Sequence, residues 1–426
     1  MEKRVVVAPK TNDRYYHVKH ESGLSILVWE MEGFSTAEAL FGTKYGSVNT
    51  RFKTNNDKEY TEVPEGIAHF LEHKLFENED TDVFELYAKT GASANAYTSF
   101  DKTCYLFSCS DNFRESLEIL LNFVQAPYFT EESVDKEQGI IGQEIQMCRD
   151  NPSWRVFFNL LAAMYHAHPV KIDIAGTIES IAEINVDLLY KCYNTFYNLH
   201  NMVLAVAGNV KLDEVLEIAD KCLKRSENEQ LETVFPDEPS EIVQAEIVQN
   251  LPVGVPLFSI GIKAEPKSGY AGLRAEMEAD IAVSVLADSS SSLYKKMLDE
   301  KLINTSFSTE VFSGDGYFGI MFAGESDNPR KVLANIVSEI ESVKVNGLDR
   351  EHFEHVKKAA YGFLIRESNN VEAAANSLIA SYFMDVTPFD AMKVLSEMTY
   401  DDVQKCICER FDTSKIALSI IESGEN

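Results

Sequence analysis

Two histidines and a glutamate lie close together just after Gly66. His69, Glu72 and His73 form the pattern HxxEH. On a helix with about 100° between successive residues, the three side chains fall within a sector of about 100° and share one face. Two imidazoles one turn apart can bind one zinc ion, and a carboxylate beside them can accept a proton from zinc-bound water. The pattern therefore predicts a hydrolytic zinc site on a helix over residues 65–77.

A catalytic zinc ion usually has three protein ligands and one open position, so a third ligand is needed. The helix expected over residues 131–149 offers Glu137 and Glu144, which are seven residues apart. Seven residues make about two helical turns, so both carboxylates point the same way, with Ile140 and Ile141 between them. Many acidic pairs on helices are simply solvated, and that alternative stays open for this pair on spacing alone.

The elements that must position these residues follow an order that occurs twice. Each half of the chain predicts strands, then helices, a strand pair, a helical run and a closing strand. Helices gathered beside an antiparallel-rich sheet, without regular βαβ alternation, indicate the α+β class with two similar domains. In the first half we expect strands at 15–19, 24–29, 39–45, 49–53, 93–98, 103–109 and 201–207, and helices at 65–77, 83–90, within 112–198, and at 213–224. In the second half we expect strands at 242–250, 257–263, 306–313, 317–323 and 415–421, and helices at 271–286, 293–302 and between the last two strands.

An acidic stretch separates the two halves. Residues 226–246 contain seven acidic residues, no lysine or arginine, and two prolines, a composition typical of a solvated linker. We therefore predict three parts: an N-terminal zinc-binding catalytic domain over 1–226, an acidic linker over 227–246, and a homologous C-terminal domain without a metal site over 247–426.

Composition excludes several classes of function. The chain has 426 residues and a net charge of −29, which disfavours binding to nucleic acid or to an anionic membrane surface. No apolar run approaches the ~20 residues of a membrane helix. Seven scattered cysteines without a CxxC pattern indicate reduced thiols and hence a cytoplasmic protein.

The sequence resembles the pitrilysin/insulinase family of zinc peptidases, the inverzincins. In that family HxxEH is followed about seventy to eighty residues later by a ligand Glu, and another Glu stands seven positions before that ligand. Here Glu144 and Glu137 hold those places. The resemblance implies that His69, His73 and Glu144 bind one Zn²⁺ per chain, that Glu72 is the general base, and that Glu137 orients the site.

The resemblance extends over essentially the whole chain and to one branch of the family. The stretches GIAHFLEHKLFE, GIIGQEIQMCRDNPSWR and HPVKIDIAGTIESI are similar to a bacterial branch of half-length, zinc-carrying subunits of paired peptidases. In size and domain plan, such chains resemble the catalytic subunit of mitochondrial processing peptidase. The strand over 93–98 resembles the family's substrate-side edge strand, which implies that Asn95 and Ala96 meet the peptide.

One departure from the family pattern concerns the second half. Related enzymes or their partner subunits carry an Arg and a Tyr seven residues apart, which help to hold the substrate carbonyl. In this chain Leu298 and Thr305 stand at those places. The resemblance therefore implies a heterodimer in which a homologous half-length subunit supplies the Arg–Tyr pair, with a homodimer as the alternative.

These observations predict a zinc metalloendopeptidase that hydrolyses unfolded peptides or leader segments. The first alternative is a non-catalytic scaffold or peptide-binding subunit of the same fold, although scaffolding does not need the complete set of His69, Glu72, His73 and Glu144. The second alternative is a metal hydrolase that acts on something other than peptides. Neither the peptide nor its cleavage site can be read from the sequence.

Overall fold

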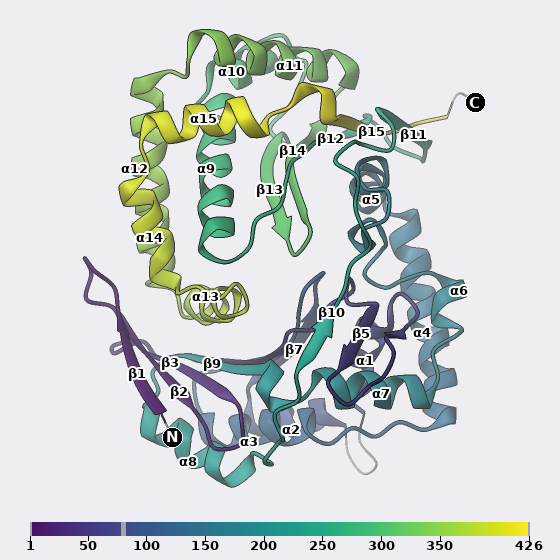
Figure 1. The fold of residues 1–426 in the computed structure, drawn as a ribbon, viewed down its shortest axis with the longest axis vertical. Coiled ribbons are helices and arrows are strands. Elements are labelled where there is room, and N and C mark those ends of the chain that lie inside the picture. Colours follow the sequence, from purple (N-terminus) through teal and green to yellow (C-terminus); the bar gives the residue numbers. More distant parts are fainter. Residues whose placement is uncertain (1, 78–81, 425–426) are drawn as a thin grey trace. The chain divides into compact units, whose positions relative to one another are not determined.

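The computed structural model describes residues 2–77 and 82–424, which form two compact units (Figure 1). Each unit draws on both halves of the chain. Unit 1 consists of Met1–Ile145, Asp173–Val234 and Ile365–Phe389, and unit 2 consists of Gln146–Ile172, Phe235–Leu364 and Asp390–Asn426. The predicted domains are continuous stretches of sequence that divide at residues 226 and 247. The compact units are discontinuous in sequence, so they do not test this division, and it stays a prediction.

Unit 1 is built on a seven-stranded sheet with the order β1-β2-β3-β9-β4-β8-β7. The β3–β9 pair is parallel and the other pairs are antiparallel. The strands are β1 (Glu2–Val7), β2 (Arg14–Lys19), β3 (Ser25–Glu30), β4 (Ala37–Thr43), β7 (Ser93–Thr98), β8 (Thr103–Cys109) and β9 (Met202–Gly208). A second sheet, β10-β5-β6, joins β5 (Arg51–Thr54), β6 (Thr61–Glu62) and β10 (Leu231–Thr233).

Helices cover both faces of the seven-stranded sheet. One face packs against helices of the first half through a core that includes Phe41, Phe70 and Phe107. These helices are α1 (Ile67–Leu75), α2 (Val83–Thr90), α3 (Phe113–Val124), α4 (Glu131–Asp150), α6 (Ile178–Ile181), α7 (Val186–Phe196) and α8 (Leu212–Cys222), with a 3₁₀ turn at Leu199–Asn201. The other face packs against α13 (Val371–Phe383), which lies along β9 and β4 (Figure 1).

Unit 2 repeats this plan with a five-stranded sheet in the order β11-β15-β12-β14-β13. The first pair is parallel and the other three are antiparallel, as in the β3-β9-β4-β8-β7 part of unit 1. The strands are β11 (Glu246–Asn250), β12 (Leu257–Lys263), β13 (Ser308–Gly314), β14 (Tyr317–Glu325) and β15 (Ile416–Glu422). The helices are α5 (Pro152–Met164), α9 (Gly269–Ala287), α10 (Ser292–Asp299), α11 (Pro329–Asn346), α12 (Arg350–Glu367), α14 (Pro388–Glu397) and α15 (Tyr400–Arg410), with 3₁₀ turns at Pro169–Lys171 and Thr413–Lys415.

The repeat confirms the predicted fold class, α+β with two similar, antiparallel-rich sheets packed against helices. Chain order pairs α1 with α9, β7 with β13, β8 with β14, α4 with α12, and α5 with α13. No helix among the described residues is long and apolar enough to cross a membrane.

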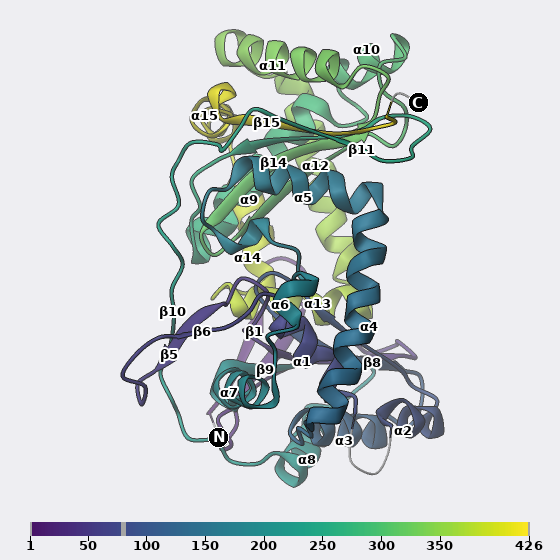
Figure 2. The same ribbon diagram turned by 90° about the vertical axis from the view of Figure 1, so that its right-hand side faces the viewer.

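The two halves of the chain exchange one helix. α13 comes from the second half and packs on the sheet of unit 1, whereas α5 comes from the first half and packs on β15 and β12 of unit 2 (Figure 2). Each helix packs closely against a glycine of the sheet, where a side chain would leave too little space. A Cβ on Gly42 of β4 would lie 3.1 Å from Ile379 of α13, and a Cβ on Gly261 of β12 would lie 2.4 Å from the sulfur of Met164 at the end of α5. The exchange explains why the compact units do not follow the chain.

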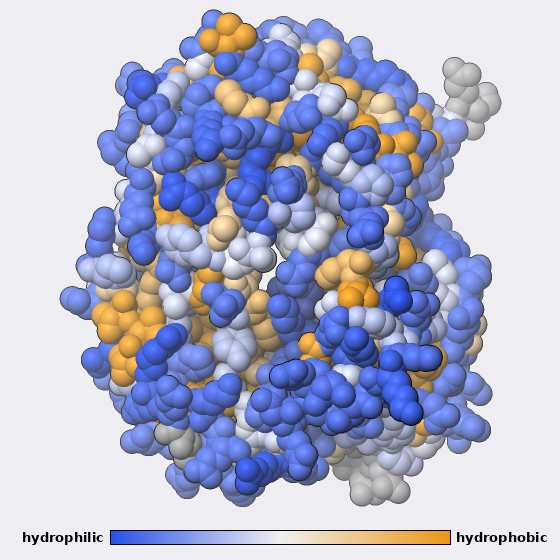
Figure 3. Space-filling model, in the orientation of Figure 1, coloured by the Kyte–Doolittle hydropathy of each residue, from blue (hydrophilic) through white to orange (hydrophobic). Residues whose placement is uncertain are grey.

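The expected strands missed β1, β6 and β10. β1 begins with the charged residues Glu2, Lys3 and Arg4, and in the described part of the chain it pairs with β2 alone. Its sequence therefore lacks the apolar alternation of a half-buried strand. Val5 and Val7 of β1 are 46% and 52% exposed. Figure 3 shows a mostly hydrophilic surface with a hydrophobic patch at the lower left, where Figure 1 draws β1.

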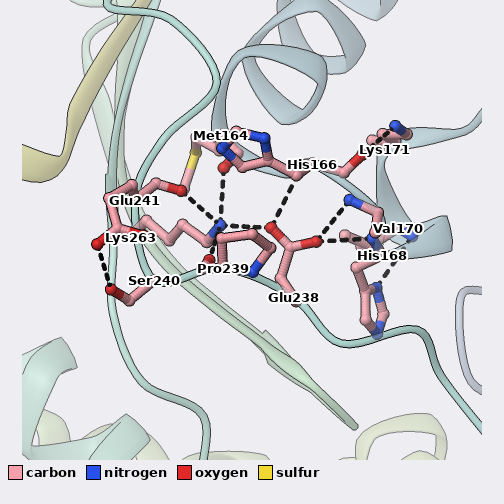
Figure 4. A network of polar contacts seen from close by, with 11 residues as sticks. Met164, His166, His168, Val170, Lys171, Glu238, Pro239, Ser240, Glu241 and Lys263 are labelled. Atoms are coloured by element: carbon pink, nitrogen blue, oxygen red, sulfur yellow. Dashed lines mark hydrogen bonds and ion pairs between the residues drawn. The ribbon is translucent and has the colours of Figure 1, made fainter.

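The acidic stretch between the halves is attached to unit 2 through Glu238. Glu238 has a side chain only 11% exposed and forms an ion pair with the buried Lys263 of β12 at 2.5 Å (Figure 4). The Lys263 ammonium also reaches the carbonyl oxygens of Met164, Pro239 and Glu241. The carboxylate of Glu238 accepts hydrogen bonds from the backbone N–H groups of residues 166–168. Composition identified the charges of this stretch but not their partners in unit 2.

Glu238→Gln is expected to lower the free energy of unfolding by about 3 kcal/mol, because it leaves the buried Lys263 ammonium without its counter-charge. Burial opposes ionisation of Glu238, but Lys263 and the three N–H groups outweigh it and lower its pKa to about 2. A lowered carboxyl pKa stabilises the fold above the unfolded-state pKa of about 4.3, and this contribution is lost as the pH falls toward 2. Denaturant titrations at pH 7 and pH 3 measure both effects. Equal stability of the variant and the wild type at pH 7 would contradict this role.

Candidate metal centre

The start of α1 is fixed by a close approach between two loops. Gly66 has φ +88°, and a Cβ there would lie 2.4 Å from the carbonyl oxygen of Ala175. The Ser180 hydroxyl donates a hydrogen bond of 2.9 Å to the carbonyl oxygen of Glu65. Phe70 and Leu71 are completely buried on the sheet side of α1. The orientation of α1 about its axis is therefore set by backbone contact at one end and by core packing along its length.

The structure brings His69, His73 and Glu144 together. The Nε2 atoms of the two histidines lie 3.6 Å from the two carboxylate oxygens of Glu144, and the three ligand atoms all lie within 4.8 Å of one another. Distances of 3.6 Å are too long for good hydrogen bonds. Three converging donors of the kinds that bind zinc, without direct bonds between them, fit one ion with an open coordination position. No other such group of His, Cys, Asp and Glu occurs among the described residues.

Glu137 occupies the position predicted for an orienting carboxylate. It is buried on α4 beside Ile141 and lies 2.9 Å from Nδ1 of His73. Burial disfavours the charged imidazolium of His73, but the hydrogen bond and the charges of Glu137, Glu72 and Glu144 outweigh burial and raise its pKa. A histidine made more basic and fixed in orientation by a carboxylate is a stronger metal ligand.

His69 has a different environment. Burial and the neighbouring His73 lower the pKa of His69 to about 3, so its imidazole is neutral at physiological pH, the form that binds a metal. Its Nδ1 is buried without a hydrogen-bond partner among the described residues. Its orientation therefore depends on the packing of α1 and on whatever binds at Nε2.

Glu72 lies on the same face of α1 as the two histidines, as the spacing predicted. The hydroxyl of Thr98, the last residue of β7, donates a hydrogen bond of 2.7 Å to its carboxylate. Burial raises the pKa of Glu72, and the Thr98 hydrogen bond and the charge of His73 oppose the rise. A partly buried carboxylate with a raised pKa is suited to accept a proton and pass it on. Sequence reasoning did not find this contact, because it joins a helix to a strand.

A buried lysine, also missed from the sequence, ties α1 to α4. Lys74 is completely buried, pairs with Glu77 and donates a hydrogen bond of 3.3 Å to the carbonyl oxygen of Ser133 on α4. Because α1 carries the histidines and α4 carries the glutamates, this contact helps to hold the two helices in register. The only sequence signal was a lysine among the apolar residues of α1.

One residue of α4 is more exposed than its spacing indicated, and β7 has a free edge among the described residues. Ile140 is 45% exposed, so the apolar side of α4 between the two glutamates is formed by Ile141 alone. On β7, the backbone N–H of Ala96 donates to the side chain of Asn95 at 2.9 Å. Among the described residues β7 pairs only with β8, which leaves the edge that carries Asn95 and Ala96 without a partner strand.

Leu298 and Thr305 belong to unit 2. Leu298 lies in α10 with a partly exposed side chain, and Thr305 follows the end of α10 with an exposed one. Neither offers a charged hydrogen-bond donor. In the folded chain, the positions at which related chains carry Arg and Tyr therefore provide no charged donor.

The fold, the HxxEH motif and three side chains that could hold a metal ion are the features by which this chain can be compared with known proteins. Residues 58–178 match the family described as Insulinase (Peptidase family M16), and residues 183–360 match the Peptidase M16 inactive domain.

The uncharacterized zinc protease YmfH of Bacillus subtilis (strain 168) is 39% identical over 417 residues, 95% of both chains. The crystal structure of a putative M16-like peptidase from Alicyclobacillus acidocaldarius superposes with a TM-score of 0.92 at 31% identity, covering 99% of this chain and 98% of that one. A third relative, the mitochondrial-processing peptidase subunit beta of Caenorhabditis elegans, is 31% identical over 194 residues, 44% of this chain and 42% of the relative.

This chain belongs to the insulinase family, peptidase family M16. The protein is accordingly a zinc metallopeptidase. The resemblance to this family stated from the sequence is confirmed, and the similarity to the bacterial protein YmfH extends over almost the whole chain.

Proposed function

We propose that this protein is a zinc endopeptidase for unfolded peptides or leader segments, with one zinc ion held by His69, His73 and Glu144. The observation that carries the proposal is the convergence of these three ligand atoms within 4.8 Å, beside Glu72 on the same face of α1. The names of the zinc-protease relatives support the metal.

The other residues of the centre would each have a distinct task. A zinc ion at this position would lower the pKa of a water molecule and polarise the scissile carbonyl. Glu72 would accept the proton of the attacking water and deliver it to the leaving amine. Thr98 would hold the Glu72 carboxylate in place, and Glu137 would hold the ring of His73.

The peptide would bind in an extended conformation along β7. This strand pairs only with β8 among the described residues, and Asn95 and Ala96 lie on it a few residues before Thr98, which contacts Glu72. Adding a peptide strand to a free sheet edge provides backbone hydrogen bonds independent of side-chain identity. Extended binding requires a substrate segment without stable structure of its own.

We therefore expect cleavage of unfolded peptides and no cleavage of stable globular proteins. The test compares a permanently unfolded protein, such as reduced and alkylated ribonuclease, with its native form, and follows new amino termini. A chelator should abolish cleavage and stoichiometric zinc should restore it. Cleavage of the native form at the rate of the unfolded form would contradict binding along β7, and chelator-resistant cleavage would contradict the zinc assignment.

We further propose that the chain works as the catalytic subunit of a heterodimer. Leu298 and Thr305 stand where related chains provide an Arg and a Tyr, so a homologous partner would supply that pair. A relative is named as a subunit of mitochondrial-processing peptidase, which supports a paired assembly. A homodimer is the alternative.

A non-catalytic scaffold or peptide-binding subunit is the second candidate function. The match of residues 183–360 to an inactive domain favours it, although the metal-binding set lies outside that range. Zinc and peptide binding without turnover, with or without a partner, would identify this second function.

A further inference from the structure

Unit 2 contains a groove at the place that corresponds to the metal centre in the repeat. α9 and α12 are the counterparts of α1 and α4 in chain order. In unit 1, α1 and α4 bring the candidate metal ligands together. In unit 2, α9 and α12 line a groove of about 920 Å³ together with α14. Among the described residues the groove has no converging set of metal ligands. The repeat has therefore kept a cavity here without the metal chemistry.

The walls of the groove are mainly apolar. α9 contributes Leu273, Met277 and Ile281, α12 contributes Val356 and Phe363, and α14 contributes Leu395. Phe363 is 52% exposed although it lies among these apolar side chains. A concave apolar surface with a large exposed ring is typical of a binding site.

The charged groups along the groove are acidic. Glu276, Asp280 and Asp288 line it, together with His352 and His355, and no lysine or arginine belongs to its described lining. Burial, followed by the charges of Glu276 and Glu310, raises the pKa of Asp280 to about 7. Glu276 is held in place by a hydrogen bond of 2.7 Å from the Ser313 hydroxyl. The side of the groove formed by α9 is therefore acidic through Glu276, Asp288 and the ionised fraction of Asp280.

We propose that this groove binds a cationic amphipathic helix of a peptide, with its apolar side chains against α9, α12 and α14 and its Lys or Arg residues facing Glu276, Asp280 and Asp288. A helix laid into an apolar groove is an established mode of peptide recognition. An anionic helix would meet repulsion from the three carboxylates. That the bound peptide is a substrate of the zinc centre rests on the proposed function, but binding itself does not.

The first experiment measures binding without turnover. The full-length Glu72→Gln protein is titrated against a fluorescent 14-residue peptide with leucine at helical i, i+3, i+4 spacing and lysine elsewhere. A second peptide has glutamate in place of every lysine. We expect saturable anisotropy with the lysine peptide and at least tenfold weaker binding of the glutamate peptide. Equal binding of both peptides would overturn the charge-based recognition.

A matched pair of variants separates the groove from the overall charge of −29. Asp280→Lys reverses a charge inside the groove, and Glu354→Lys makes the same change at an exposed position of α12 outside the groove lining. Asp280→Lys should weaken binding of the lysine peptide at least tenfold, and Glu354→Lys should change it less than twofold. Phe363→Ser, at an exposed position, should also weaken it several-fold. Equal effects of the two charge reversals would show non-specific attraction and overturn the proposal, and thermal melts verify that each variant is folded.

The same variants in the active protein distinguish this proposal from the proposed function. For a cationic substrate, Asp280→Lys should raise KM while kcat stays within twofold, and for a short neutral peptide both constants should stay unchanged. Absence of saturable binding of the lysine peptide to the Glu72→Gln protein, with intact cleavage by the active protein, would overturn the groove alone. Peptide binding without any cleavage would overturn the endopeptidase and leave the groove in place. Binding of a homologous chain that competes with the peptide would assign the groove to subunit assembly and also overturn the proposal.

Discussion

The Glu72→Gln protein is expected to keep its zinc and to lose peptidase activity by about 10²–10⁴-fold. An amide has the size of the carboxylate and still accepts the hydrogen bond from Thr98, but it cannot accept the proton of an attacking water. Glu72 is outside the set of three converging ligands, so the affinity for zinc should change little. Zinc content by atomic emission and kcat/KM on one unfolded peptide, measured on the same sample, check both halves of this prediction.

The matched control for Glu72→Gln is His73→Ala, one residue further along α1. This variant should lose both zinc and activity, because it removes one of three ligands and the partner of Glu137. A Glu72→Gln protein with unchanged turnover would contradict the role of base. A Glu72→Gln protein without zinc would instead make Glu72 a ligand, and full zinc in His73→Ala would remove His73 from the site.

Addition of a homologous partner chain is expected to raise the activity of this protein by about 10²–10³-fold. Removing one donor to a developing oxyanion costs about that factor, and neither Leu298 nor Thr305 can replace an arginine. The experiment assays the purified chain alone, the partner alone and the mixture. A partner that carries the Arg–Tyr pair but lacks a complete HxxEH motif is the appropriate one.

The control for this prediction is the partner with its arginine changed to alanine. That variant should form the same complex, seen by size-exclusion chromatography, but give no activation. Full activity of the isolated monomer would contradict the need for a partner. Full activity of a homodimer would favour the alternative assembly and would show that the Arg–Tyr pair is dispensable.

Local patterns were sufficient to predict most elements of the fold. The sequence analysis placed Val83–Thr90, Ser93–Thr98, Thr103–Cys109 and Leu257–Lys263 with the bounds that the structure shows. These segments are short runs rich in apolar or β-forming residues, or an amphipathic helix, and they are bounded by turn residues or helix caps such as Gly91. β1 and β10 were missed because each pairs with a single strand among the described residues, and neither sequence alternates between apolar and polar residues over a full strand length.

The candidate site was also predictable where its residues are close in sequence or fixed by helical spacing. His69, Glu72 and His73 share one helical face, and Glu137 and Glu144 share another, as their spacing indicated. Contacts between elements were not predictable, because no periodic signal specifies which helix meets which strand. Thr98 reaches Glu72 from a strand, and Lys74 reaches Ser133 from a neighbouring helix. The exchange of α5 and α13 could not be predicted either, because it also consists of contacts between elements far apart in the sequence.

The helix exchange has a consequence for synthesis on the ribosome. One face of β4 and β9 packs against α13 through Leu40, Val203 and Ala205, which are fully buried in the same cluster as the apolar side chains of that helix. The strands are complete at residue 208, but α13 ends at residue 383. At roughly 5–20 residues per second, translation of the intervening chain takes roughly 10–35 s. For that time a nascent chain exposes an apolar sheet face that its own later sequence must cover, which makes unit 1 a natural client for chaperones that shield growing polypeptides.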